Sequence, residues 1–103
     1  MKFTSLNKKN HFDNLKKEEF CIASGGLKVF VKENGTTSSR LGISISSKHA
    51  NAVNRNKFKR RTREAVRSLS DYKKIDILVV ANKDSSNLTT TEILKIFKSH
   101  PLL

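Results

Sequence analysis

The stretch "NRNKFKRRTREAVR", residues 54–67, combines a helical pattern of apolar residues with a dense run of positive charge. Between Arg55 and Arg67 it places seven Lys or Arg residues and one acid, Glu64. At about 100° per residue, the residues that share one side of such a helix are Phe58, Thr62, Ala65, Val66 and Leu69. This stripe predicts a helix from about residue 51 to residue 69 that packs on a sheet and turns its charge outward.

The outward charges of this helix repel one another. Almost opposite the apolar stripe lie Asn56, Arg60, Arg63 and Arg67, with Lys59 beside them. Like charges four residues apart occur in the pairs Arg55/Lys59, Lys57/Arg61, Lys59/Arg63 and Arg63/Arg67. The repulsion energy of these four pairs adds up to roughly 1–2 kcal/mol, which is a noticeable part of a domain stability of about 5–15 kcal/mol. A helix charged only for solubility would mix in Glu, whereas phosphates would neutralise the repulsion, so we interpret the helix as a nucleic-acid surface.

The composition indicates one small domain, residues 1–103, with a polyanionic partner. Twenty-one Lys and Arg residues stand against nine Asp and Glu, for a formal net charge of +12. Nucleic acid or an anionic membrane would offset this charge. The longest apolar run, residues 77–81, is too short to span a bilayer, and the first residues hold no signal-peptide core. The single Cys21 excludes an internal disulfide and indicates a reducing, cytoplasmic location.

The segments before the basic helix predict one helix and three strands. A short helix is expected at residues 10–18. The stretches "CIAS" (21–24) and "LKVFVKE" (27–33) flank the pair Gly25-Gly26, which predicts a hairpin. In "RLGISIS" (40–46) apolar and polar residues alternate, which predicts a strand with one face on a core.

The segments after the basic helix complete the predicted fold. "IDILVVA" (75–81) shows little alternation, which predicts a central strand buried on both faces. Thr89 and Glu92 match a capping box, so a last helix is expected to begin near Thr89. The predicted order is α-β-β-β-α-β-α, an α+β sandwich of one sheet and packed helices.

A second candidate surface lies on the strand at residues 27–33. Lys28, Phe30 and Lys32 alternate onto one face and place an aromatic ring between two cations. Such a face suits a single strand of nucleic acid, because bases stack on the ring while lysines follow the phosphates. Core packing is the competing interpretation for Phe30, and the flanking lysines argue against full burial of the ring.

The acidic, histidine and cysteine residues form no recognisable catalytic or metal site. The nine acids are scattered, and no pair has the spacing of a two-metal carboxylate site. His11, His49 and His100 match no metal-ligand pattern. Cys21 lies in an apolar setting that is typical of a small buried residue rather than of a nucleophile. We therefore expect no catalytic residue and no metal or cofactor site in this protein.

Residues 40–64 resemble the signature of the protein subunit of bacterial ribonuclease P. In that family a strand of the form R-x-G-x-S-x-S is followed by Lys and then by A-V-x-R-N-x-x-K-R-x-x-R-E on a helix. The matching residues are Arg40, Gly42, Ser44, Ser46, Lys48, Ala52, Val53, Arg55, Asn56, Lys59, Arg60, Arg63 and Glu64. Element order and spacing agree over nearly the whole chain. The chain departs from the family pattern at Lys57, usually Arg, and at Ala50, commonly Gly.

The resemblance implies a fold, a role and partners. The family fold is a two-layer sandwich with a left-handed β-α-β crossover, like the second domain of ribosomal protein S5. The family's protein assists an RNA subunit, which uses Mg²⁺ to cleave the 5′ leader from precursor tRNA. The implied partners are therefore the catalytic RNA and precursor tRNA, in the cytoplasm and away from membranes, with the oligomeric state left open.

Two groups of site residues are predicted from the helix charge, the alternating strand and the resemblance together. The RNA-binding group on the basic helix is Arg55, Asn56, Lys57, Lys59, Arg60, Arg61, Arg63 and Arg67. The leader-binding cleft group is Lys8, Phe12, Lys16, Lys28, Phe30 and Lys48. For Phe12, core packing and a place in the cleft are weighed equally. Lys16 stands where the family often has a second aromatic residue, so electrostatics should contribute more than stacking.

Two other functions use the same basic helix. A general RNA-binding or ribosomal-type protein would bind structural RNA without any role in tRNA processing. A DNA-binding module would insert residues 54–67 in the major groove, but the helix needs its apolar stripe for the sheet and no helix precedes it at helix-turn-helix spacing. The DNA-binding hypothesis is therefore disfavoured.

Overall fold

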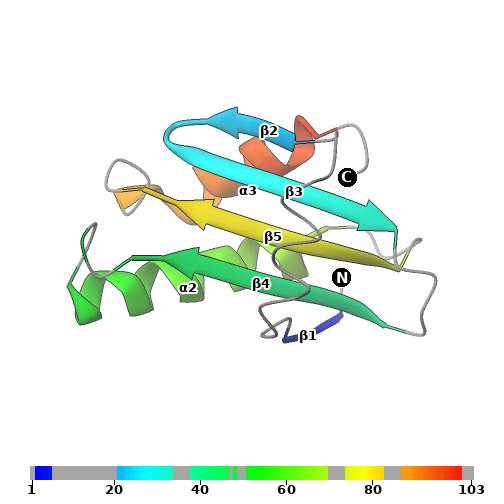
Figure 1. Cartoon of the computed structure of the whole chain (residues 1–103), viewed down its shortest axis with the longest axis horizontal. Coiled ribbons are helices and arrows are strands. Elements are labelled where there is room, and N and C mark those ends of the chain that lie inside the picture. The colour runs from blue at the N-terminus through cyan, green and yellow to red at the C-terminus, as the bar shows by residue number, and fades with distance from the viewer. Residues whose placement is uncertain are drawn as a thin grey trace.

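A mixed sheet with helices on one face makes up the described part of the chain, as the computed structural model shows (Figure 1). The described residues are 2–5, 21–33, 38–46, 48, 51–69, 74–82 and 87–100. Within them the strands are β1 (Phe3–Ser5), β2 (Cys21–Ser24), β3 (Leu27–Glu33), β4 (Ser39–Ile45) and β5 (Ile75–Ala81), and the helices are α2 (Ala52–Arg67) and α3 (Thr90–Lys98). The helix expected at residues 10–18 lies outside the described residues.

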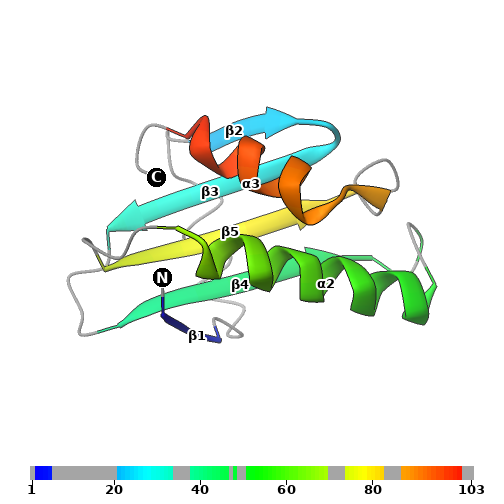
Figure 2. The same ribbon diagram turned by 180° about the vertical axis from the view of Figure 1, so that it is seen from behind.

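The five strands follow the order β1-β4-β5-β3-β2, with β5 in the centre as predicted. β4 pairs with β5 in parallel, and α2 makes the connection between them. Figure 2, in which both helices lie in front of the sheet, shows that this crossover is left-handed. Because about 98% of such connections are right-handed, this topology is unusual, and it is the one that the family resemblance implied. β1, which pairs in parallel with β4, was not predicted, since three residues are too few to show a periodic pattern.

The hairpin between β2 and β3 turns at two glycines, as the sequence predicted. Gly25 has φ 60° and Gly26 has φ 79°, and both lie in the left-handed region that such tight hairpin turns require. A Cβ on Gly25 would meet only ordinary contacts with Leu88 and Ile96, whereas a Cβ on Gly26 would collide with the side chain of Asn82. The two glycines therefore tolerate substitution to different degrees.

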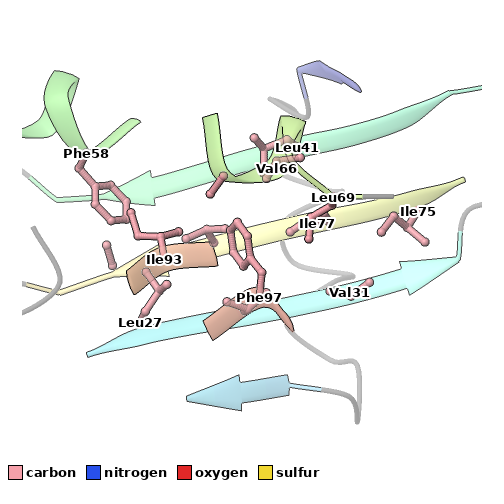
Figure 3. Close-up of a cluster of buried hydrophobic side chains, with 14 residues drawn as sticks. Leu27, Val31, Leu41, Phe58, Val66, Leu69, Ile75, Ile77, Ile93 and Phe97 are labelled. Atoms are coloured by element: carbon pink, nitrogen blue, oxygen red, sulfur yellow. The ribbon is translucent and has the colours of Figure 1, made fainter. Parts of the chain in front are cut away.

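The main core lies between the sheet and the two helices (Figure 3). The residues of the predicted α2 stripe, which are all buried, are Phe58, Thr62, Ala65, Val66 and Leu69. The Thr62 hydroxyl donates to the carbonyl oxygen of Phe58 at 2.9 Å, so burial leaves it satisfied. Each strand contributes alternate residues, whose side chains lie on the sheet face that the helices cover. These residues are Leu27, Val29, Val31, Leu41, Ile75, Ile77, Val79 and Ala81. The apolar stripe of α2 therefore packs on the sheet as its spacing predicted.

The last helix begins where the sequence predicted. Thr89 is the N-cap of α3, and its hydroxyl accepts a hydrogen bond from the backbone N–H of Glu92 at 3.2 Å. The Glu92 carboxylate accepts in return from the backbone N–H of Thr89, which completes the capping box. Ile93 and Phe97 are fully buried against the main core.

A second, smaller cluster lies on the other face of the sheet and corrects the expectation for Phe30. Phe30 is 9% exposed and pairs across the ladder with Leu78, which is fully buried. The expectation that the neighbouring lysines would prevent burial of this ring is therefore wrong. Lys28 and Lys32 are exposed, because a long lysine side chain can carry its ammonium group to water while the ring between them stays covered.

Cys21 also differs from its expected environment. It is exposed on the edge strand β2 instead of buried, and its thiol lies 3.6 Å from the carbonyl oxygen of Ile22. Its register partner is Phe30, so the two residues lie on the same side of the hairpin. An apolar neighbourhood in sequence did not indicate burial here, because an edge strand leaves one side of its residues without a neighbouring strand.

The two glycines of the hairpin give the first prediction. Gly25→Ala should lower the free energy of unfolding by about 1–2 kcal/mol. This is the cost of the left-handed backbone conformation for alanine, and the added Cβ meets no close contact. Gly26→Ala should lower it more, since the Cβ also displaces Asn82. Urea unfolding followed by circular dichroism measures both, and equal losses would contradict the described contact with Asn82.

The burial of Phe30 gives the second prediction. Phe30→Ala should lower the free energy of unfolding by about 3 kcal/mol, because it leaves a cavity next to Leu78. Lys28→Ala, the matched exposed neighbour, should change it by no more than about 0.5 kcal/mol. Thermal and urea unfolding of both variants provide the comparison. A Phe30→Ala protein of unchanged stability would show that the ring is not part of the packed structure.

Candidate nucleic-acid interface

The outward side of α2 carries the first candidate surface. Its predicted residues Asn56, Lys57, Arg60, Arg63 and Arg67 are exposed, and Arg55, Lys59 and Arg61 are half-buried at the flanks. The helix achieves this because its apolar stripe is used entirely for the core, which directs the opposite side to solvent. The exposed cations of α2 therefore lie opposite its apolar stripe, as the helical spacing predicted. We call the surface formed by Lys57, Lys59, Arg60 and Arg63 with Asn56 the α2 surface.

The protein's own carboxylates do not neutralise this surface in the described ranges. There, no acid lies within ion-pair distance of Lys57, Lys59, Arg60 or Arg63. Glu64, the acid on α2 itself, accepts a hydrogen bond at 3.3 Å from the hydroxyl of Thr90 at the start of α3. The described residues therefore leave the like-charge repulsion along α2 in place, and an external polyanion would relieve it.

In the part of the chain that the structure describes, the members of the RNA-binding group that make contacts within the protein are Arg55, Arg61 and Arg67. The Nη1 group of Arg61 donates to the carbonyl oxygen of Leu88 at 3.4 Å, which directs this side chain towards α3. The guanidinium carbon of Arg67 lies 5.5 Å from the ring centroid of Phe3, a cation–π contact that joins the end of α2 to β1. Arg61 and Arg67 thus differ from Arg60 and Arg63 in having a structural partner.

The N-terminus of α2 adds to the positive potential at one end of the surface. Asn51 is the N-cap, and its Oδ1 accepts from the backbone N–H of Asn54 at 2.9 Å. No acid occupies the first turn, so the partial positive charge of the helix dipole there is not neutralised from within the helix. Lys48, exposed just before this end, adds a full charge.

The second candidate surface is the sheet face that points away from α2 and α3, which we call the outer face. Side chains of one parity on β4, β5 and β3 form three rungs across it. The rungs, in order along the strands, are Ser44–Val80–Lys28, Gly42–Leu78–Phe30 and Arg40–Asp76–Lys32. The outer face is therefore apolar in the middle, with cations at both ends.

An ion pair between Arg40 and Asp76 occupies the last rung. Arg40 Nε donates to Asp76 Oδ1 at 2.7 Å, and Arg40 Nη2 donates to Oδ2 at 2.6 Å. The hydrogen bond to Asp76 raises the pKa of the Arg40 guanidinium above its ordinary value. Sequence reasoning missed this pair, because the two residues are 36 apart and meet only through the parallel register of β4 and β5.

The predicted leader-binding group is described in part. Lys28 and Phe30 lie on the outer face, Lys28 exposed and Phe30 buried, and Lys48 is exposed beyond β4. Lys8, Phe12 and Lys16 lie outside the described residues. The structure thus brings Lys28 and Phe30 together on one face but does not test the rest of the group.

The described residues include neither a cluster of metal ligands nor a helix that could span a membrane. Among the residues that the structure describes, no three His, Cys, Asp or Glu side chains come together as metal ligands. The described helices are also too short or too polar to cross a bilayer.

Comparison with known proteins identifies a family and relatives that this chain resembles. A family model described as Ribonuclease P matches residues 1–100. A ribonuclease P protein component from Macrococcus caseolyticus is 35% identical over 92 residues, which cover 87% of this chain and 80% of that protein. The two chains are thus similar over most of their length.

Solved structures show the same fold. The RNase P protein of Staphylococcus aureus matches with a TM-score of 0.78 and 31% identity, over 96% of this chain and 93% of that one. A mutant of the Staphylococcus aureus protein, described as having defective mRNA degradation activity, matches with a TM-score of 0.77 and 31% identity, over 93% of this chain and 83% of that one. The family match spans almost the whole sequence and the sheet topology agrees, so this chain belongs to the family of bacterial ribonuclease P protein components.

Proposed function

We propose that this protein binds the catalytic RNA of ribonuclease P and the 5′ leader of precursor tRNA in the cytoplasm, and so assists endonucleolytic removal of the leader. The RNA subunit would carry the catalytic Mg²⁺ ions and the chemistry. The protein would act as an accessory subunit that supplies binding and orientation but no catalytic group.

The observation that carries the proposal is the un-neutralised charge of the α2 surface. Lys57, Lys59, Arg60 and Arg63 have no carboxylate partner within the described ranges, although their mutual repulsion destabilises the free helix. Phosphate contacts would remove that repulsion and release counterions from the RNA. In a member of the ribonuclease P family, the catalytic RNA is the polyanion that this surface would meet.

The outer face supports the second part of the proposal, binding of the leader. Lys28 and Lys32 project from β3 on either side of the buried Phe30. Because the middle rung is buried, a single strand would contact this face through its exposed lysines, with its phosphates near their ammonium groups. Because Phe30 is covered, the described part of the face would bind the leader through charge more than through stacking on this ring.

A general RNA-binding function is the alternative. The solved Staphylococcus aureus mutant described as defective in mRNA degradation activity favours it, because mRNA has no tRNA leader to recognise. Such a protein would use the α2 surface for RNA of many kinds, and the outer face would not distinguish a leader.

The third prediction separates the two functions. Purified protein added to the organism's ribonuclease P RNA at low Mg²⁺ should enhance cleavage of precursor tRNA. Affinity should rise as the leader is lengthened from one nucleotide to several, because added phosphates reach the outer face. Single-turnover cleavage and equilibrium binding measure the two effects. If neither cleavage nor leader-dependent affinity is enhanced, the general RNA-binding function is the correct one.

The fourth prediction tests the α2 surface. Arg60→Ala should weaken binding to the catalytic RNA and reduce the slope of log K against log salt by about 0.7–0.9, the value of one lost phosphate contact. Lys98→Ala, which removes one exposed charge on α3, is the matched control and should leave the slope unchanged. Filter binding over a salt series provides both slopes. Equal slopes for wild type and Arg60→Ala would remove Arg60 from the interface.

A further inference from the structure

We propose that Arg40, braced by Asp76, is a phosphate-binding site at one end of the outer face, and that it holds a backbone phosphate of the precursor-tRNA leader. This inference rests on the proposed leader binding and assigns to it two residues outside both predicted site groups.

The first support is that Asp76 binds only one edge of the Arg40 guanidinium. An arginine has five N–H donors, and Asp76 takes one from Nε and one from Nη2. The other edge, formed by Nη1 and the second N–H of Nη2, has the two-pronged geometry that matches a phosphate. No further bond to Arg40 comes from the part of the chain that the structure describes. The edge suited to a phosphate is therefore not used by any described residue.

The second support is the difference in burial between the two partners. The Arg40 side chain is 27% exposed, whereas that of Asp76 is 9% exposed. The carboxylate is thus almost fully covered, while the guanidinium is partly exposed to solvent. This arrangement fixes the long arginine side chain before any ligand arrives, which reduces the entropy lost on binding.

The third support is the charge of the rung. Asp76 has Arg40 as its register partner on β4 and Lys32 as its register partner on β3. Two cations therefore flank one carboxylate, and the rung remains net positive. The three side chains of this rung therefore carry two positive charges and one negative charge, a balance that favours an anionic ligand.

The position of the rung sets the length of leader that it can reach. Lys28 and Lys32 are four residues apart on β3, which is about 13 Å along the strand. Lys48 lies beyond the end of β4 that carries Ser44, at the opposite end from Arg40. A single strand that follows the outer face from Lys48 would meet Lys28 before Arg40. Contact with Arg40 should therefore require additional leader nucleotides.

The test compares charge-conserving and charge-removing changes. Arg40→Lys keeps the positive charge but cannot donate two parallel hydrogen bonds to one phosphate, and Arg40→Gln loses the charge. Lys98→Gln removes one exposed charge on α3, away from the outer face, and is the matched control. Each variant is assembled with the ribonuclease P RNA, and binding of precursor tRNA is measured for leaders of increasing length over a salt series.

The expected result is a loss that depends on leader length. Arg40→Lys should bind long-leader substrate about tenfold more weakly, the value of one charge-assisted hydrogen bond, and one-nucleotide-leader substrate as wild type does. Arg40→Gln should also lower the salt slope by about 0.7 on the long leader. The Lys98→Gln control should match wild type on both substrates. A variant with a damaged fold would instead lose affinity for both, and thermal unfolding of each variant identifies it.

The variant Asp76→Asn gives an independent test, because the two explanations predict opposite changes in affinity for the long leader. This change raises the net charge of the protein by one, so a purely electrostatic outer face would bind the long leader more tightly. If Asp76 braces Arg40, affinity for the long leader should fall while that for the short leader stays unchanged. Tighter or equal binding of the long leader would overturn the proposal.

Two failures can be told apart. If the wild-type complex shows no preference for long leaders, the proposed function fails and the phosphate site fails with it. If wild type prefers long leaders and Arg40→Lys retains the whole preference, only the phosphate site is rejected, and the ion pair serves to join β4 and β5.

Discussion

The packing of the α2 stripe against the sheet is the contact on which the rest of the structure depends. Phe58, Thr62, Ala65 and Val66 are fully buried there, which fixes the rotation of the helix about its axis. With that rotation fixed, Arg60 and Arg63 can only point to solvent. The stabilising contact thus creates the electrostatic problem, because it assembles like charges that have no carboxylate partner within the described ranges.

The same packing explains why one sheet carries two different surfaces. Both helices lie on one face (Figure 2), so the cationic α2 surface is separated from the outer face by the thickness of the sheet and helix layers. In the proposed function, the two RNA segments would therefore contact different residues. The left-handed crossover through α2 places β4 beside β5, and this pairing brings Arg40 to Asp76 across 36 residues of sequence.

Burial on the outer face shows how neighbouring side chains can have different roles. Phe30 is covered while Lys28 and Lys32, its neighbours of the same parity, are exposed. The polarity of the neighbours misled the sequence-based expectation, because lysine extends past a covered ring and does not force it into water. The exposed Cys21 misled it in the opposite direction, since edge position depends on the sheet order and not on local hydrophobicity.

The sequence alone determined the local features: the bounds of β5, the position of α2 and its apolar stripe, the Gly25-Gly26 hairpin and the Thr89 capping box. These follow from interactions between residues close in the chain, whose periodicity and turn chemistry can be read directly. The handedness of the crossover entered only through family resemblance. Tertiary structure decided the pairing of β1, the burial of Phe30 and the meeting of Arg40 with Asp76. Each of these depends on strand order and register, which arise from contacts between distant segments and leave no periodic signal in the chain.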